Sequence, residues 1–221
     1  MSLYCLSAGF GFKKLQAKKP HSMILASGTL KPLDTLEAEL EVPFPIKLEN
    51  CHVIPAKQVS IQIVKSRNES LPFCLTRRNK NDSEMNKELA HALGEYSSTA
   101  KGGVLIFFPS YQKLNEVRAK MSCSGVLNWL RKKKTVYFED KDPKIFKSIC
   151  EKFEADIESM DLKKRSGSIL MGVCRGRLSE GIDFKDRKGR LVIIVGIPYP
   201  KKTDPRITLK QFILDQRLHA S

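Results

Sequence analysis

Short apolar runs alternate with amphipathic helical patterns over the second half of this sequence. Such runs occupy residues 104–108 (VLIFF), 168–174 and 191–197, and a shorter one occupies residues 135–138. Runs of this length are typical of strands that are buried on both faces. Strands that alternate with helices form a parallel sheet with helices on both faces. We therefore predict an α/β fold built on such a sheet.

One helix is predicted before these strands, two between them and one after them. Apolar residues recur at helical spacing over residues 83–97. Ser110 is predicted to cap a second helix, Asp142 a third that continues to about residue 160, and Asp204 the last. The apolar stripes predicted to face the core are Met85, Leu89, Leu93 and Tyr96; Leu114, Val117 and Met121; and Phe146, Ile149, Cys150, Phe153 and Ile157.

The first 64 residues have a different organisation, interrupted by prolines. We predict an irregular lead-in over residues 1–20, a short buried strand at 22–26 (SMILA) and a helix over 33–40. The partial alternation of residues 51–64 predicts further strands. The strand at 22–26 runs into Ser27-Gly28-Thr29, which is typical of a tight turn. Because prolines separate it from the later strands, we assign that strand to a different domain.

A polar loop follows the strand predicted at 168–174. Ligands gather beyond the carboxyl ends of parallel strands, where loops present side chains and backbone N–H groups. Arg175 and Arg177 carry guanidinium groups that pair with phosphate oxygens. Ser179 is predicted to cap a short helical turn that favours an anion. Gly176 and Gly181 are predicted to let another backbone or a ligand come close.

The charge of the chain favours a polyanionic partner. The 39 Lys and Arg residues exceed the 24 Asp and Glu residues, for a net charge of +15. Nucleic acid is the commonest intracellular polyanion, although a solvated basic surface is the alternative. The basic run at residues 131–134 is predicted to be solvated, with a phosphate-contacting edge as the alternative.

Cysteine and histidine spacing indicates neither a disulfide framework nor a metal site. We therefore expect reduced thiols and no metal bound by this chain. No apolar run approaches the roughly 20 residues that cross a bilayer, and the first residues lack a signal-peptide layout. We expect an intracellular protein with no membrane partner.

Four stretches together resemble a known family. They are ILASGTLKPLD (24–34), GGVLIFFPSY (102–111), VCRGRLSEGIDF (173–184) and GRLVIIVGIPYP (189–200). They are similar to helicase motifs III, IV and V of the xeroderma pigmentosum group D-like superfamily 2 DNA helicases. The LYCLSAGFGF lead-in, PFPIKLEN and the PYP ending are most similar to the Fanconi anaemia group J and regulator-of-telomere-elongation branch.

The resemblance implies two RecA-like domains that close on ATP and Mg²⁺ while gripping single-stranded DNA. Residues 1–40 would then be the end of the arch and the last strand of the first motor domain. Residues 41–221 would be the second motor domain, incomplete at its carboxyl end. The resemblance further implies a nuclear 5′-to-3′ DNA helicase of the DNA repair or telomere maintenance type, whose partners are single-stranded DNA, ATP and its own first motor domain.

Site residues follow by motif match. Ser27 and Thr29 would couple the nucleotide state to the grip on DNA. Ser179, Glu180 and Gly181 would contact the DNA backbone or bridge to the nucleotide, and Asp183 would face the nucleotide site. Asp183 and Glu180 would have catalytic roles, and Gly181 and Asp183 would bind ATP. The residues implied to contact DNA are Ser27, Thr29, Ser110, Tyr111, Arg175, Arg177 and Ser179.

The sequence also departs from the family pattern. It contains no G-x-x-x-x-G-K-[ST] phosphate loop and no DEAH-type acidic pair. The 4Fe-4S cysteines of the family would lie before residue 1, and its glutamine and arginine-finger motif would lie after residue 221. Lys31 stands where a small residue is usual, and Arg177 where a lysine is common. We therefore expect a portion of a helicase that is inactive when isolated.

Two other interpretations stay open. The chain could be a truncated module that binds nucleic acid or a partner protein without catalysis. A dinucleotide-binding domain on a similar sheet is disfavoured, because no G-x-G-x-x-G follows any predicted strand.

Overall fold

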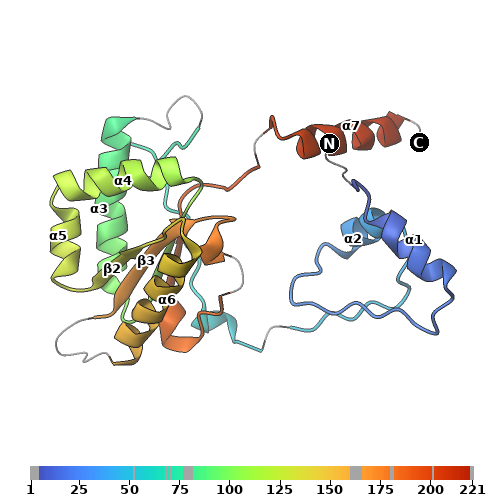
Figure 1. Cartoon of the computed structure of the whole chain (residues 1–221), viewed down its shortest axis with the longest axis horizontal. Coiled ribbons are helices and arrows are strands. Elements are labelled where there is room, and N and C mark those ends of the chain that lie inside the picture. The colour runs from blue at the N-terminus through green and yellow to red at the C-terminus, as the bar shows by residue number, and fades with distance from the viewer. Residues whose placement is uncertain are drawn as a thin grey trace. The chain divides into compact units, whose positions relative to one another are not determined.

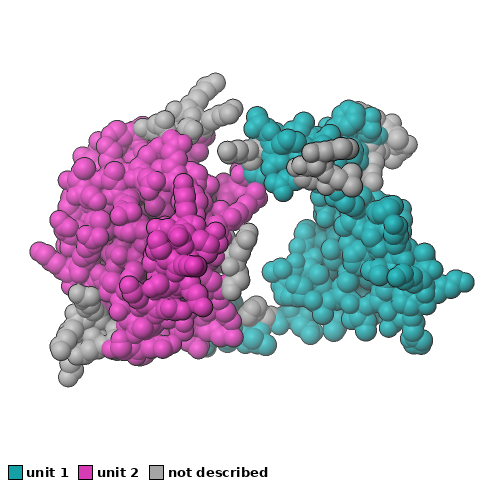
Figure 2. All heavy atoms as spheres, in the orientation of Figure 1, with its two compact units in different colours: residues 1–60, 200–221 teal, residues 61–199 magenta. Residues whose placement is uncertain are grey.

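The structure is a computed structural model, and it describes residues 5–51, 53–67, 69, 71–76, 82–159, 166–179, 182–200 and 202–219. The chain forms two compact units. Residues 1–60 and 200–221 make up unit 1, and residues 61–199 make up unit 2 (Figure 2). Each unit is described by itself. The predicted domain boundary between residues 40 and 41 stays a prediction.

Unit 2 is built on a four-stranded parallel sheet (Figure 1). Its strands are β1 (Val104–Phe108), β2 (Thr135–Phe138), β3 (Ser168–Val173) and β4 (Leu191–Ile194). They lie in the order β2-β3-β1-β4, and Ile106 at the middle of β1 pairs with Met171 on one side and Ile193 on the other. The predicted parallel α/β sheet is confirmed.

Helices cover both faces of this sheet, because side chains alternate between the faces along each strand. Val104, Ile106 and Phe108 belong to a core shared with helices α3 (Ser83–Thr99), α4 (Tyr111–Cys123) and α5 (Val126–Arg131). Leu105 packs on the other face in a cluster with α6 (Pro143–Glu158). Burial of both faces explains why β1 and β3 read as continuous apolar runs, whereas the edge strand β4 leaves Val192 and Ile194 exposed although its sequence is equally apolar.

Two helices of unit 2, α4 and α6, begin at the predicted caps. The hydroxyl of Ser110 accepts a hydrogen bond from the Lys113 N–H at 3.2 Å, and the carboxylate of Asp142 accepts one from the Lys144 N–H at 2.8 Å. Such caps satisfy N–H groups that have no partner inside the helix. They also fix where the chain turns from each strand into the next helix.

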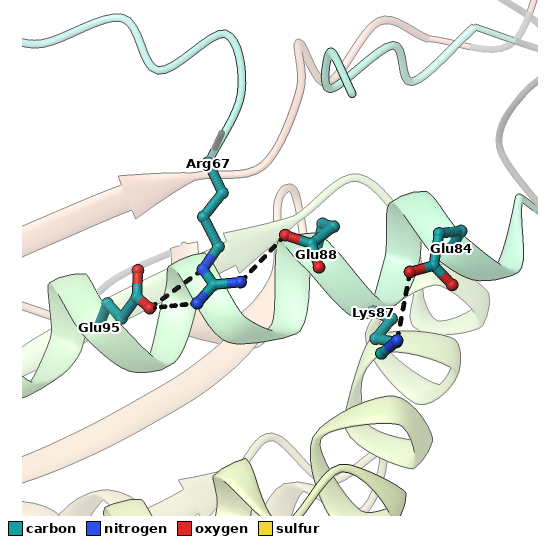
Figure 3. Close-up of polar contacts among 5 residues, drawn as sticks. All are labelled: Arg67, Glu84, Lys87, Glu88 and Glu95. Carbon is teal, nitrogen blue, oxygen red and sulfur yellow. Dashed lines mark hydrogen bonds and ion pairs between the residues drawn. The ribbon is translucent and has the colours of Figure 1, made fainter. Parts of the chain in front are cut away.

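The segment that leads into α3 is held by an ion-pair network (Figure 3). Arg67 donates to Glu88 at 3.1 Å and to Glu95 at 2.7 Å, so that one guanidinium spans two turns of α3. The hydrogen bond from Arg67 lowers the pKa of Glu95. Because the guanidinium is part-buried and bonds both carboxylates, this contact anchors the segment next to the short antiparallel bridge between Ser66 and Pro72.

The starts of three strands are joined by a buried lysine, Lys134, which is 0% exposed. Its ammonium donates to the carbonyl oxygens of Ala100 at 2.6 Å, Ser166 at 3.0 Å and Gly102 at 3.2 Å. Burial lowers the pKa of Lys134 to about 8. The three carbonyls match the three N–H donors of the charged form. Lys134 thus has a structural role at the edge where the strands begin, unlike the exposed residues before it.

Unit 1 consists of helices and extended chain in the part that the structure describes. Its helices are α1 (Gly9–Ala17), α2 (Leu33–Leu40), the short η1 (Ala56–Gln58) and α7 (Pro205–His219). Lys210 on α7 pairs with Glu39 on α2 at 2.7 Å. The predicted helices at 33–40 and after Asp204 are confirmed, whereas the irregular lead-in over residues 1–20 is wrong because it contains α1.

The predicted strands at residues 22–26 and 51–64 are also wrong. No described residue in either range lies in a strand. Ile24 is 85% exposed, and Ile61 and Ile63 are each 87% exposed. A strand is stabilised by a neighbouring strand and by burial of one face, and the described part of the chain provides neither for these segments. Their apolar alternation alone therefore does not produce a sheet.

Candidate nucleic-acid interface

The loops that follow β1, β2 and β3 meet at one edge of the unit 2 sheet, which we call the carboxyl edge. It comprises residues 109–111, 139–142 and 174–179. Because the strands are parallel, their carboxyl ends lie at the same side of the sheet. Side chains from three separate parts of the sequence are thereby brought within contact distance.

The contacts at this edge converge on the carboxylate of Glu139, which is only 8% exposed. One oxygen accepts hydrogen bonds from the Tyr111 hydroxyl at 2.8 Å and from the Arg177 N–H at 3.0 Å. The other oxygen accepts from the Val173 N–H at 2.7 Å. Buried carboxylates are stable only when their oxygens are satisfied in this way. Glu139 therefore joins the ends of all three strands.

Sequence reasoning missed Glu139. Its position directly after the strand at residues 135–138 was the available signal, since side chains at that place reach the carboxyl edge. A single Glu in that position has no motif around it, and its partners are the Tyr111 hydroxyl and two backbone N–H groups that only the fold brings to it.

Tyr111 takes part in this network through its hydroxyl. Burial raises the pKa of Tyr111 to about 12, and the hydrogen bond to Glu139 acts in the same direction. The hydroxyl therefore stays protonated and donates at neutral pH. The Lys141 ammonium lies 5.3 Å from the centre of the Tyr111 ring, which is half-buried. The ring thus stands beside a cation, at a site where a base or sugar could pack.

The loop after β3 is held close to Glu139 by two glycines. A Cβ atom on Gly176 would lie 2.7 Å from one Glu139 oxygen, and one on Gly172 would lie 2.5 Å from the other. These distances are too short for any side chain. The predicted close approach at Gly176 is confirmed, and the group that approaches is a carboxylate of the same chain.

The two arginines of this loop are exposed while the backbone around them is fixed. Arg175 has a φ of 60°, in the left-handed region that is uncommon for residues other than glycine. Leu178, three residues further, is 1% exposed and belongs to the cluster under α6. Anchored on both sides, the loop presents the guanidinium groups of Arg175 and Arg177 to solvent.

Comparison with known proteins gives a family for this arrangement. Residues 93–221 match the family described as the helicase C-terminal domain. The chain belongs to the helicase C-terminal domain family. The match covers the four strands and the whole carboxyl edge.

Relatives of this helicase C-terminal domain carry related names. The chain is 37% identical over 223 residues to the regulator of telomere elongation helicase 1 homolog of Arabidopsis thaliana. It is 33% identical to the homologs of Aedes aegypti and Culex quinquefasciatus. Each alignment covers 98% of this chain but only 21–22% of the relative. The chain thus spans about a fifth of the length of the relatives it matches.

The predicted nucleotide-facing residues lie in the segment that returns from β3 to β4. Asp183 is exposed and pairs with Lys185 at 2.8 Å. The next residue, Phe184, contacts Phe153 of α6 edge-on, with ring centres 5.8 Å apart. Glu180 and Gly181 lie outside the described residues. No described contact joins Asp183 to Tyr111 of the carboxyl edge. The predicted role of Asp183 at the nucleotide therefore stays a prediction.

Two of the serines predicted to contact DNA, Ser110 and Ser179, lie at the carboxyl edge. Ser110 is exposed and caps α4. Ser179 is the last residue of the 3-10 turn η2 (Arg177–Ser179), and residues 180 and 181, where a turn that it caps would begin, lie outside the described residues, so its capping role stays a prediction. Leu178 in the middle of η2 is buried.

The remaining predicted residues, Ser27 and Thr29, form a turn in unit 1. The Thr29 N–H donates to the Ser27 hydroxyl oxygen at 3.2 Å, and both residues are exposed. This is the ordinary hydroxyl turn that the sequence favours. Their proposed coupling role depends on contacts outside unit 1 and stays a prediction.

The described part of the chain shows neither a metal-binding cluster nor a membrane span. It holds no group of three or more His, Cys, Asp and Glu residues arranged to bind a metal ion. None of its helices combines the length and apolarity that a membrane span requires.

Proposed function

We propose that the carboxyl edge of this helicase C-terminal domain binds the backbone of single-stranded DNA, as the second motor domain of an ATP-dependent 5′-to-3′ helicase. The observation that carries the proposal is the fixed loop with exposed Arg175 and Arg177, beside the half-buried ring of Tyr111. The names of the relatives, which are helicases of telomere elongation, support it.

The chemistry of the edge suits a ligand that is read by its backbone. Guanidinium groups and hydroxyls bind phosphate oxygens without distinguishing bases. An aromatic ring offers a stacking surface to any base. We therefore assign backbone contacts to Arg175, Arg177, Ser110 and Ser179, and a stacking contact to Tyr111.

The ATP-binding part of the proposal concerns the segment after the DNA-contacting loop. We propose that Glu180, Gly181 and Asp183 face ATP and Mg²⁺ held mainly by the first motor domain, and that Ser27 and Thr29 transmit the nucleotide state. Phosphoryl transfer requires a positioned Lys, Mg²⁺ and Arg together. A nuclear location, a 4Fe-4S cluster in the parent protein and a role in DNA repair or telomere maintenance belong to the same proposal.

Binding of a fluorescent single-stranded oligonucleotide of about 20 nucleotides tests the DNA part. We expect a Kd of about 1–100 μM at low salt. The logarithm of the binding constant should fall with log[salt] at a slope of roughly −2 or steeper, because Lys and Arg side chains displace counterions from the DNA phosphates. Anisotropy titrations at several salt concentrations measure both quantities. Two oligonucleotides of unrelated sequence should bind alike. Affinity that does not change with salt would rule out the proposed phosphate contacts.

Hydrolysis of ATP by the purified chain provides a second test. Because the sequence contains neither a phosphate loop nor a DEAH-type pair, we expect phosphate release no faster than in a buffer control. The assay is run with and without single-stranded DNA. A robust DNA-stimulated turnover would contradict the assignment of this chain to the second motor domain alone.

The alternative is a non-catalytic binding module. It rests on the same observation, that the sequence contains neither a phosphate loop nor a DEAH-type pair. The two interpretations differ in one assay: association of the chain with a separately expressed first motor domain of a homolog, measured with and without ATP and single-stranded DNA. Association that ATP and DNA strengthen supports the motor interpretation, and DNA binding without any such association supports the module.

A further inference from the structure

The carboxylate of Glu139 is placed where a negative charge would oppose the binding of DNA. It lies at the carboxyl edge, hydrogen-bonded to the backbone of the loop that carries Arg175 and Arg177. A carboxylate near a phosphate path weakens binding by simple Coulomb repulsion. Its presence there calls for a compensating role.

The geometry of its partners indicates that role. Glu139 accepts from the Val173 N–H, at the end of β3, and from the Arg177 N–H, at the start of the 3-10 turn η2. These two N–H groups lie on either side of residues 174–176, which include Arg175. The Tyr111 hydroxyl donates to the same carboxylate from the start of α4. One side chain on β2's carboxyl end therefore fixes both proposed DNA-contacting segments relative to each other.

The fit leaves little room for alternatives. The carboxylate is 8% exposed and lies against Gly172 and Gly176, where a Cβ atom would come within 2.5–2.7 Å of its oxygens. All three described donors present hydrogen to an acceptor, which suits an ionised carboxylate and not an amide. The three donors also spread the negative charge of Glu139, which reduces its effect on a nearby phosphate.

We propose that Glu139 is a positioning residue for the DNA-binding loop: it holds residues 173–177 and Tyr111 in the arrangement that presents Arg175 and Arg177 to the DNA backbone. This inference rests on the proposed function, since it assigns a role within the same site. A positioning role and a purely electrostatic role of Glu139 predict opposite changes in DNA affinity for one substitution.

That substitution is Glu139→Gln. The substitution removes a negative charge beside the proposed phosphate path, so electrostatics alone predicts tighter binding. The amide would turn an NH₂ group toward N–H and O–H donors, and the loop would lose its anchor. We expect single-stranded DNA affinity to fall about 5- to 20-fold, and the slope of log K against log[salt] to become shallower by roughly 1, as for the loss of one or two phosphate contacts.

Matched variants separate positioning from charge and from folding. Glu151→Gln removes the same charge from an exposed site on α6 and should leave affinity within about 2-fold of wild type, as expected for an exposed charge that salt screens. Glu139→Asp keeps the charge but is one methylene shorter, so it cannot reach all three donors. It should also weaken binding, and it serves as the test if Glu139→Gln does not fold.

Amide hydrogen exchange tests the same inference without DNA. In Glu139→Gln, and in Glu139→Asp, the Val173 and Arg177 amides should exchange at least about 10-fold faster, as expected when a local hydrogen bond opens freely. The same amides should stay protected in Glu151→Gln. The exchange measurement separates the proposed DNA binding from the proposed anchoring. If the wild-type chain binds no DNA but the amides exchange as expected, the proposed function fails and the anchoring by Glu139 stands. Unchanged exchange at both amides, or DNA binding by Glu139→Gln as tight as wild type or tighter, would overturn the inference.

Discussion

Replacement of Phe153 by alanine is expected to destabilise unit 2 by about 4 kcal/mol, within the range for deleting a fully buried aromatic ring. Phe153 is 0% exposed and lies at the centre of the α6-side cluster. Its ring meets Tyr137 of β2 and Phe184 of the β3–β4 segment edge-on, with centroid distances of 6.4 and 5.8 Å. The substitution therefore opens a cavity between helix, sheet and the segment that carries Asp183.

Urea denaturation followed by the fluorescence of Trp129 measures this effect. Trp129 is the only tryptophan of the chain and lies on α5 in the same unit. The control is Ile145→Ala on the same helix, where the side chain is 51% exposed, and we expect it to change stability by about 1 kcal/mol or less. A loss for Phe153→Ala no larger than for Ile145→Ala would mean that α6 does not pack on the sheet as described.

Reversal of both loop charges, Arg175→Glu with Arg177→Glu, is expected to weaken single-stranded DNA binding about 10- to 100-fold at low salt. Two proposed phosphate contacts are replaced by two repulsive charges, and the slope of log K against log[salt] should become shallower by roughly 1.4. Both side chains are exposed, so the fold should be retained. The loss should be similar for oligonucleotides of different sequence, because phosphate contacts do not read bases.

The matched control reverses two charges at the opposite edge of the sheet. Arg131→Glu with Lys132→Glu makes the same change in net charge at exposed positions near the start of β2. We expect a loss of less than about 3-fold, since these charges act only at long range and are screened by salt. An equal or larger loss for the control pair would favour the phosphate-contacting edge at residues 131–134 and not the carboxyl edge.

The sheet of unit 2 was predictable because each signal was local. The run at residues 104–108 is apolar throughout and ends at a proline, and β1 spans Val104–Phe108. Ser110 and Asp142 are strong capping residues in front of apolar stripes, and α4 and α6 begin directly after them. The alternation of these elements then determines a parallel sheet.

The elements that were missed or wrongly predicted depend on contacts that the sequence does not display. Helix α1 contains two glycines and has no side-chain cap, so its nine residues carry no start signal. The α5 helix begins after Gly125 and has only six residues. Residues 22–26 and 51–64 have strand-like composition, but β propensity reflects packing against neighbouring strands.

The candidate site was predictable to the level of the loop but not of its anchor. Arg175 and Arg177 could be predicted as site residues, because they directly follow a buried strand and lie in a stretch that matches a family motif. Glu139 lies 34 residues from Val173, and their contact depends on the register of β2 beside β3. Only the folded chain brings that carboxylate to the loop backbone.

The central claim is that the carboxyl edge of unit 2 binds single-stranded DNA, and an NMR titration of the ¹⁵N-labelled chain with an unlabelled oligonucleotide tests it most directly. The account predicts that the largest amide shift changes fall on residues 109–111, 139–142 and 174–179. Changes concentrated on α3 and α5, or on the residues before β1 and β2, would contradict it.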